Sequence, residues 1–84
     1  MYKIYPAIIH NEDGYWVEFP DLPGCQTRGD TLEETMGLAQ EALGLYLASL
    51  IEHNEPIPAA SDITEIHAEN GQTTYISADV DAYS

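Results

Sequence analysis

Basic residues are almost absent from this chain. Its 84 residues include two Lys and Arg against fifteen Asp and Glu, which gives a formal net charge of −13. A surface this acidic repels phosphate, so we expect no direct nucleic acid binding by this chain. The charge favours fast association with basic partners at low salt, although acidity can also serve solubility alone.

Cysteine and long apolar runs are scarce as well. Cys25 is the only cysteine, so no internal disulfide is possible and a reducing compartment fits. The first ten residues contain no apolar segment as long as that of a signal peptide. No run approaches the roughly 20 apolar residues of a membrane helix. We therefore expect a cytoplasmic protein without a membrane segment, which forms a single domain over residues 1–84.

Residues that build metal and catalytic sites are few and scattered. The histidines are His10, His53 and His67, and none is spaced from another or from Cys25 as metal ligands usually are. Arg28 is the one nearby cation that could lower the pKa of the Cys25 thiol, so a small buried hydrophobe is favoured over a nucleophile. We expect no metal site, no cofactor and no enzymatic activity.

Carboxylates are the remaining candidates for chemistry. A nuclease of the RNase H type needs several carboxylates that converge on two metal ions. Those available are Glu18, Asp21, Asp30 and Glu33. Glu18 faces away from the predicted core, and Glu33 falls in the first turn of a predicted helix, where the helix dipole favours negative charge. A magnesium- or manganese-dependent nuclease is therefore the least favoured of three hypotheses.

The first part of the chain predicts three strands. Tyr2–His10 and Tyr15–Phe19 form a hairpin through a turn at residues 11–14, and Gln26–Arg28 is long enough for a short strand only. Pro6 lacks an amide hydrogen, which predicts an edge position or a bulge. Both faces of the first strand are apolar, so we expect the helix to cover one and a second subunit the other.

A long amphipathic helix follows, from about Thr31 to His53, because apolar residues recur at steps of three and four. The predicted buried stripe is Leu32, Met36, Ala39, Leu43, Tyr46 or Leu47, and Leu50, widened by Ala42 and Ile51. Asp30 with Glu33, or Thr31 with Glu34, would each form a capping box, and the sequence leaves both open.

Two glycines, Gly37 and Gly44, lie within this helix. Each costs roughly 1 kcal/mol of helix stability relative to alanine. Either this cost is tolerated, or the glycines allow the helix backbone to approach the sheet or another subunit closely.

The remaining residues predict one more strand. Two prolines force an extended exit at Asn54–Pro58, and a short helical turn is expected at Asp62–Glu65. Gln72–Val80 predicts the last strand, which a long crossover permits to pair parallel to the first, and residues 81–84 predict a loose tail. The order β-β-β-α-β gives an α+β fold class, in which a three- to four-stranded, mostly antiparallel sheet packs one long helix on one face.

One stretch, Phe19–Glu34, joins a strand end, a tight turn, a short strand and a helix start. Pro23 presets φ near −65° and Gly24 accepts a positive φ, which predicts a type II turn at residues 22–25. The order F-P-D-L-P-G-C-x-T-x-G-D-T-x-E-E, followed by an alanine-rich helix, resembles the N-terminal domain of HicB-type antitoxins. The resemblance covers roughly Tyr2 to Val80 and is strongest from Tyr15 to Leu43.

The resemblance implies a partial RNase H-like fold without nuclease activity. It also implies a partner, a small basic mRNA-cleaving toxin of the HicA type, which the domain binds and blocks in a type II toxin-antitoxin system. Members of the family often carry a DNA-binding segment after the last strand. No separate DNA-binding domain is visible after Val80. Either that segment has been removed, or the chain is a stand-alone HicB-like protein that has no role in operator binding.

We expect the partner to contact the exposed part of the motif and the strand before it. The predicted partner-binding residues are Trp16, Glu18, Asp21, Leu22, Pro23 and Cys25. Trp16 lies beside an acid on the face away from the core, which is equally consistent with packing between strands and with a partner contact. The alternative to an antitoxin is a stand-alone acidic HicB-like domain, a dimer or tetramer, that binds a small ligand or another protein.

Overall fold

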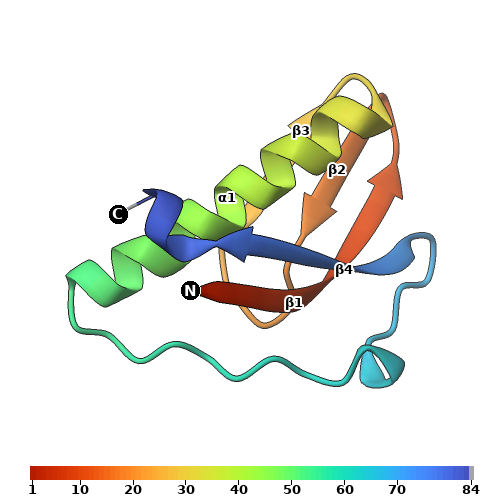
Figure 1. Cartoon of the computed structure of the whole chain (residues 1–84). Coiled ribbons are helices and arrows are strands. Elements are labelled where there is room, and N and C mark those ends of the chain that lie inside the picture. The colour runs from red at the N-terminus through yellow and green to blue at the C-terminus, as the bar shows by residue number, and fades with distance from the viewer. Residues whose placement is uncertain (84) are drawn as a thin grey trace.

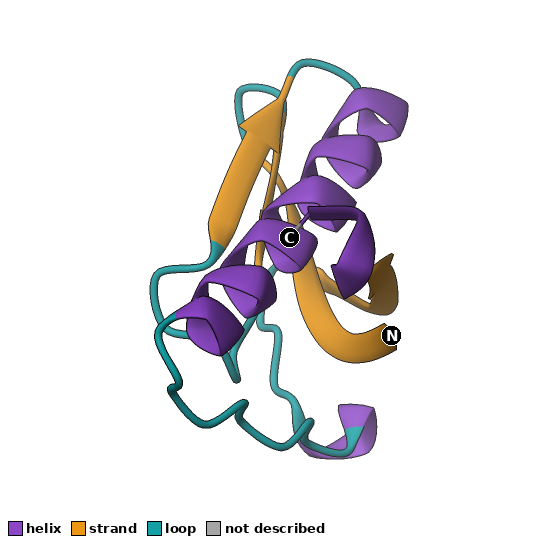
Figure 2. Ribbon diagram, turned by 60° about the vertical axis from the view of Figure 1, so that its left-hand side comes forward, coloured by secondary structure: helices purple, strands orange, loops and turns teal. Residues whose placement is uncertain are grey.

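One antiparallel sheet carries one long helix on one of its faces (Figure 1). The computed structural model describes residues 1–83, and the strand order across the sheet is β3-β2-β1-β4. The elements are β1 (Tyr2–Asn11), β2 (Tyr15–Glu18), β3 (Gln26–Gly29), α1 (Leu32–Glu52), η1 (Ile63–Glu65), β4 (Gln72–Asp79) and η2 (Val80–Tyr83), where η marks a 3₁₀ turn. This confirms the predicted fold class and element order, and Figure 2 shows α1 lying across the sheet.

The two faces of the sheet differ because side chains alternate along each strand. The hairpin pairs Ile9 with Val17 and His10 with Trp16, so these neighbouring pairs point to opposite faces. The core lies between one face and the helix, and its buried members include Tyr5, Ala7, Val17, Ile76 and Ala78 of the sheet and Ala39, Leu43 and Leu47 of α1. We call the opposite side of the sheet the open face.

The helix begins where the capping signals predict, and the structure decides between the two possible caps. Thr31 is the N-cap, because its side-chain oxygen accepts a hydrogen bond from the Glu34 amide at 3.2 Å. At the other end, His53 is the C-cap and Asn54 turns the chain with a φ of +56°. The predicted helix bounds are therefore confirmed, with both caps included.

The buried residues of α1 differ in part from the predicted stripe. Leu32 and Ile51 are 46% and 44% exposed, whereas Thr35 is fully buried and donates from its hydroxyl to the Thr31 carbonyl oxygen at 2.6 Å. Gly44 is also buried, and a Cβ there would lie 2.2 Å from the ring of Tyr83. The close approach of the Tyr83 ring therefore explains the glycine at position 44. Gly37 faces open space, so its cost in helix stability is simply tolerated.

The C-terminal residues are ordered, so the predicted loose tail is wrong for residues 81–83. They belong to η2, in which Val80 is buried and Tyr83 packs against the helix at Gly44. The amino terminus is tied to the same turn, since the Val80 amide donates to the Met1 carbonyl at 2.8 Å and the Met1 ammonium pairs with Asp79 at 3.2 Å. Residue 84 lies outside the described part of the chain.

The prediction that the last strand could pair parallel to the first is wrong, because β4 pairs antiparallel with β1. Residues 53–71 carry the chain along the whole lower side of Figure 1 before β4 starts opposite Ile9, so the strand returns toward the N-terminus. The edge position predicted from Pro6 is also wrong for β1 as a whole, because β1 lies between β2 and β4 in the sheet. Pro6 lies, however, in the half of β1 that pairs with β4 alone.

Candidate partner-binding site

The loop between β2 and β3, residues 19–25, is folded onto itself; we call it the motif loop. The Leu22 amide donates to the Phe19 carbonyl and the Cys25 amide to the Leu22 carbonyl, both at 3.0 Å. Gly24 has a φ of +82°, which with the second of these bonds confirms the type II turn. The hydroxyl of Tyr46 on α1 donates to the Pro23 carbonyl at 2.9 Å, so the loop is also held to the helix.

Leu22 and Cys25 of the motif loop lie in the core, as does Phe19 at the start of the loop. Leu22 is 0% exposed and Cys25 is 5% exposed. The Cys25 thiol donates to the Ala42 carbonyl at 3.7 Å, and burial raises the pKa of the thiol to about 11. This confirms the prediction that Cys25 is a small buried hydrophobe. Because both side chains lie in the core, the folded chain offers neither to a partner, and the predicted site loses Leu22 and Cys25.

Asp21 is bound within the protein by the connection between α1 and β4. Its two carboxylate oxygens accept from the Ser61 amide at 2.8 Å and from the Ser61 hydroxyl at 2.5 Å. The Tyr5 hydroxyl donates to the carbonyl of Pro58 in the same connection. Burial raises the pKa of Tyr5, and the negative charge of Asp21 adds to this rise. Asp21 therefore fastens residues 53–71 beside the motif loop, a structural role that its sequence position alone did not indicate.

The open face carries an aromatic and charged cluster at its β2 end. The rings of His10 and Trp16 stack with their centroids 3.9 Å apart and an interplanar angle of 13°. Nε2 of His10 lies 2.7 Å from a carboxylate oxygen of Glu18, whose side chain is 37% exposed. Trp16 is thus half-buried by packing between strands, which is one of its two predicted roles, and its other side remains accessible.

A shallow pocket of about 440 Å³ adjoins this cluster. Its lining residues are Glu12, Trp16, Gln26, Thr27 and Arg28. Arg28 stands opposite Trp16 in the β2–β3 ladder and donates to the Glu12 carbonyl at 3.4 Å. The pocket therefore brings together an indole ring, an amide and a cation. We call the surface made by Glu12, Trp16, Glu18, Gln26 and Arg28 the Trp16 surface.

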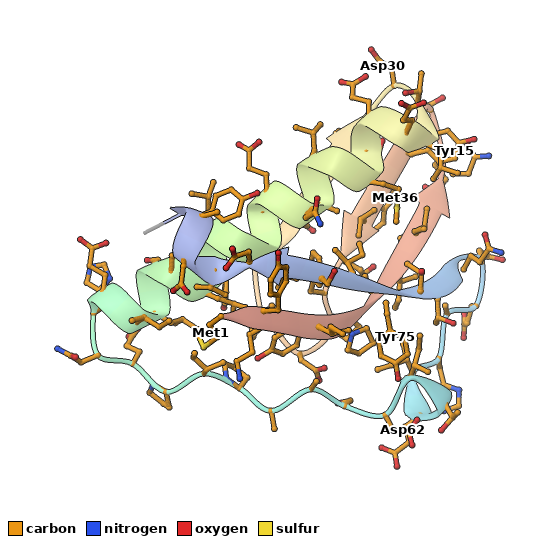
Figure 3. The ribbon with its side chains drawn as sticks, in the orientation of Figure 1. Met1, Tyr15, Asp30, Met36, Asp62 and Tyr75 are labelled. Atoms are coloured by element: carbon orange, nitrogen blue, oxygen red, sulfur yellow. The ribbon has the colours of Figure 1, made fainter. Side chains whose placement is uncertain are left out.

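The acidic residues considered for nuclease chemistry do not converge. Glu18 bonds to His10, Asp21 to Ser61, and Glu33 lies in the first turn of α1. Asp30 lies at the tip of the β3–α1 turn, far from the connection (Figure 3). Within residues 1–83 no three His, Cys, Asp or Glu side chains gather as a metal site would need. In the same residues, no helix has the length and apolarity that a membrane span requires.

Sequence reasoning missed two partners of the predicted site, His10 and Ser61. His10 could not be placed from the predicted turn at residues 11–14, which pairs it with Tyr15; in the structure β1 continues to Asn11, which pairs with Tyr15, so His10 lies opposite Trp16. Ser61 carried no signal either, since its bond to Asp21 depends on the path of a long connection between distant elements. Of the predicted residues, Trp16 and Glu18 lie together on the open face, and Pro23 is exposed on the separate motif loop.

Comparison with known proteins identifies the fold and the motif. Residues 5–83 match the family described as HicB-like antitoxin of bacterial toxin-antitoxin system. A UPF0150 protein of Thermoplasma acidophilum is 47% identical over 69 residues, which cover 79% of this chain and 99% of that protein. Antitoxin HicB 1 of Photorhabdus laumondii is 36% identical over 67 residues, which cover 77% of this chain and 43% of the antitoxin.

The solved structures agree. One chain of a toxin-antitoxin complex from Streptococcus pneumoniae superposes with a TM-score of 0.90 at 27% identity, over 99% of this chain and 73% of that chain. The chain spans less than half the length of some curated relatives, such as the Photorhabdus antitoxin and a Haemophilus phage HP1 protein. The match over residues 5–83 shows that this chain belongs to the HicB-like antitoxin family of bacterial toxin-antitoxin systems.

Proposed function

We propose that the protein is an antitoxin that binds and blocks a small basic mRNA-cleaving toxin of the HicA type. The observation that carries this proposal is the family match across residues 5–83, on a fold shared with a chain of a toxin-antitoxin complex. The action is steric and electrostatic: the antitoxin covers the catalytic residue of the toxin and excludes RNA. The protein has no enzymatic activity of its own and acts in the cytoplasm, where its target would cleave mRNA.

The charge of the chain supports a basic partner. A net charge of −13 on 84 residues gives a strong negative field, which speeds encounter with a cationic protein and weakens as salt is added. The same field opposes contact with RNA or DNA, so the antitoxin competes with the RNA for the toxin without binding nucleic acid directly.

The Trp16 surface is the part of the predicted site best suited to the toxin. Trp16 combines a large apolar ring with an exposed side, and such side chains often dominate binding energy. Its stacking on His10 and the His10–Glu18 contact fix the ring before a partner arrives, which lowers the entropy lost on binding. Asp21 and Pro23 remain as second contacts on the motif loop, because both are at least partly exposed.

The alternative is a stand-alone acidic domain that forms a homo-oligomer and binds a small ligand or another protein. It is favoured by one observation: the Thermoplasma protein matches this chain along 99% of its own length, so the whole of that relative corresponds to this domain. In this case the pocket of about 440 Å³ beside Trp16 would hold the ligand.

A pull-down with the tagged full chain from its native cytoplasm separates the two functions. The antitoxin proposal predicts that one small basic protein is retained, and that it cleaves RNA once this chain is removed. A Trp16→Ala variant should retain less of it, while Leu45→Ala, which removes an exposed side chain from α1, should retain as much as the wild type. If the wild type retains no RNA-cleaving protein, the stand-alone function replaces the antitoxin.

A further inference from the structure

Arg28 is the only arginine or lysine on the open face of the sheet. The chain has two such residues in all, Arg28 and Lys3, against fifteen Asp and Glu. Lys3 pairs with Ala78, a core residue, so it belongs to the face that the helix covers. Arg28 pairs with Trp16 and is exposed on the open face. A guanidinium thus lies within the surface where we place the partner, in a chain that is otherwise strongly acidic.

None of the described carboxylates neutralises this guanidinium. Within residues 1–83 the ion pairs are made by the Met1 ammonium and by His10, and none involves Arg28. A guanidinium carries several N–H donors, yet Arg28 donates one hydrogen bond in this part of the chain, to the Glu12 carbonyl at 3.4 Å. Glu18 shares the open face but lies 2.7 Å from Nε2 of His10, on the other side of β2. Most donors of Arg28 are therefore left for a group from outside.

The pocket beside Trp16 indicates the chemistry of that group. Its volume is about 440 Å³, and its lining includes the Trp16 indole, the Gln26 amide and Arg28. The stacking of Trp16 on His10 makes the indole a fixed apolar wall. A guanidinium matches a carboxylate through two parallel hydrogen bonds. An Asp or Glu side chain carries its carboxylate on a short apolar stem, so the stem would contact the indole while the oxygens accept from Arg28.

The net charge of the chain decides what carries this carboxylate. A free small anion or a nucleic acid that approaches the pocket is repelled by a net charge of −13. A carboxylate on a cationic protein is not, because the same field attracts the protein as a whole. The basic partner of the proposed function is therefore the best carrier of an anion for this pocket.

We propose that Arg28 receives an Asp or Glu side chain of the basic toxin in the pocket beside Trp16, an inference that rests on the proposed function. The contact has the opposite polarity to the general attraction between the two proteins. A basic protein without a carboxylate at this position would bring its own cations against Arg28, and like charges across an interface oppose binding. Arg28 is thus a specificity-determining residue, which lets an acidic surface reject other basic proteins.

The sign of a charge effect tests the proposal. Arg28→Gln and Lys3→Gln remove the same positive charge, so general attraction alone predicts that both bind the toxin as tightly as the wild type or tighter. A carboxylate held by Arg28 predicts instead that Arg28→Gln raises the dissociation constant by about tenfold or more, while Lys3→Gln stays within about twofold. Arg28→Lys keeps the charge but not the planar fork, and it should lie between the wild type and Arg28→Gln. Calorimetric titration with the RNA-cleaving protein retained in the pull-down gives these values.

Rates and charge reversal separate this contact from damage to the fold. The loss in Arg28→Gln should appear in a faster dissociation, while the association rate stays equal or rises because the chain is more negative. Arg28→Glu should weaken binding most. Among toxin variants in which one Asp or Glu is changed to Lys, one should restore the affinity of Arg28→Glu by about tenfold or more, a recovery that a misfolded variant would not show.

The outcomes distinguish this inference from the proposed function. If the chain retains the toxin and Arg28→Gln binds it as tightly as the wild type, the inference is overturned and the antitoxin function stands. If no RNA-cleaving protein is retained, the proposed function fails and the inference fails with it. A single-stranded RNA oligonucleotide that binds the wild type but not Arg28→Gln would assign the pocket to nucleic acid and would also overturn the inference.

Discussion

The motif loop and the open face of the sheet show opposite relations between sequence and binding. The motif loop carries the most recognisable residues of the chain, and these residues stabilise the fold. Leu22 and Cys25 are buried in the core, and Asp21 accepts a hydrogen bond from the Ser61 amide. The open face carries little of the motif, yet it presents Trp16, Ile4 and Tyr75 to solvent. A distinctive sequence can therefore mark a structural element, and the exposed surface that we propose for binding lies elsewhere.

The largest effect that would sharpen this comparison is expected from Leu22→Ala. Leu22 is fully buried, so its truncation leaves a cavity and should lower the free energy of unfolding by about 2–5 kcal/mol. Tyr75→Ala on the open face is the control and should cost less than about 1 kcal/mol, because half of that side chain is exposed. Urea unfolding followed by fluorescence measures both, and equal losses would erase the contrast between the two regions.

When affinity for the toxin is measured instead of stability, Trp16→Ala on the open face should have a larger effect than a change in the motif loop. The affinity for the toxin should fall by about 30-fold or more, the loss expected for an aromatic residue at the centre of an interface. Pro23→Ala, an exposed change in the motif loop, should alter affinity by less than about threefold. Isothermal titration calorimetry against the toxin gives both values. A Pro23 effect larger than that of Trp16 would return the binding site to the motif loop.

Asp21→Ala tests the structural role of the motif loop with a smaller expected loss of stability. It removes two hydrogen bonds to Ser61 and should lower the free energy of unfolding by about 1–2 kcal/mol. Ser61→Ala removes the hydroxyl bond alone and should cost less. In the double variant the two losses should not add, because both changes act on the same contact. Additive losses, or an Asp21 effect confined to toxin binding, would contradict the structural role.

The smallest effect concerns the pH response of Cys25. Burial raises the pKa of its thiol from 9.0 to about 11 in the folded chain, so the neutral thiol favours folding. This contribution is complete below pH 9 and is lost as the pH rises through about 11. Unfolding curves at pH 8 to 11 should therefore show a smaller alkaline loss of stability in Cys25→Ala than in the wild type. Identical losses would mean that the thiol titrates normally.

Local structure could be predicted from the sequence because local interactions decide it. The type II turn follows from Pro23 and Gly24, and the helix start follows from Thr31, whose hydroxyl oxygen meets the Glu34 amide. The hairpin follows from the predicted turn, which in the structure spans residues 12–14 and in which Asp13 and Gly14 both have a positive φ. In each case the physical cause lies within four residues of its effect.

Contacts between distant segments could not be predicted in the same way. The direction of β4 depends on the path of residues 53–71, and the packing of Tyr83 on Gly44 depends on where that path ends. Burial of Leu22 and Cys25 also required the placement of α1 over the motif loop, without which an apolar turn resembles a binding loop. Of the six residues predicted to bind a partner, the structure leaves Trp16, Glu18, Asp21 and Pro23 at least partly exposed and buries Leu22 and Cys25.

The most direct test of the central claim is RNA cleavage by the purified toxin, titrated with this protein at low and at moderate salt. The account predicts that cleavage falls to background near one equivalent, and that more protein is needed as salt weakens the attraction between the acidic chain and its basic target. Cleavage that proceeds equally with and without a molar excess of the protein would contradict the account.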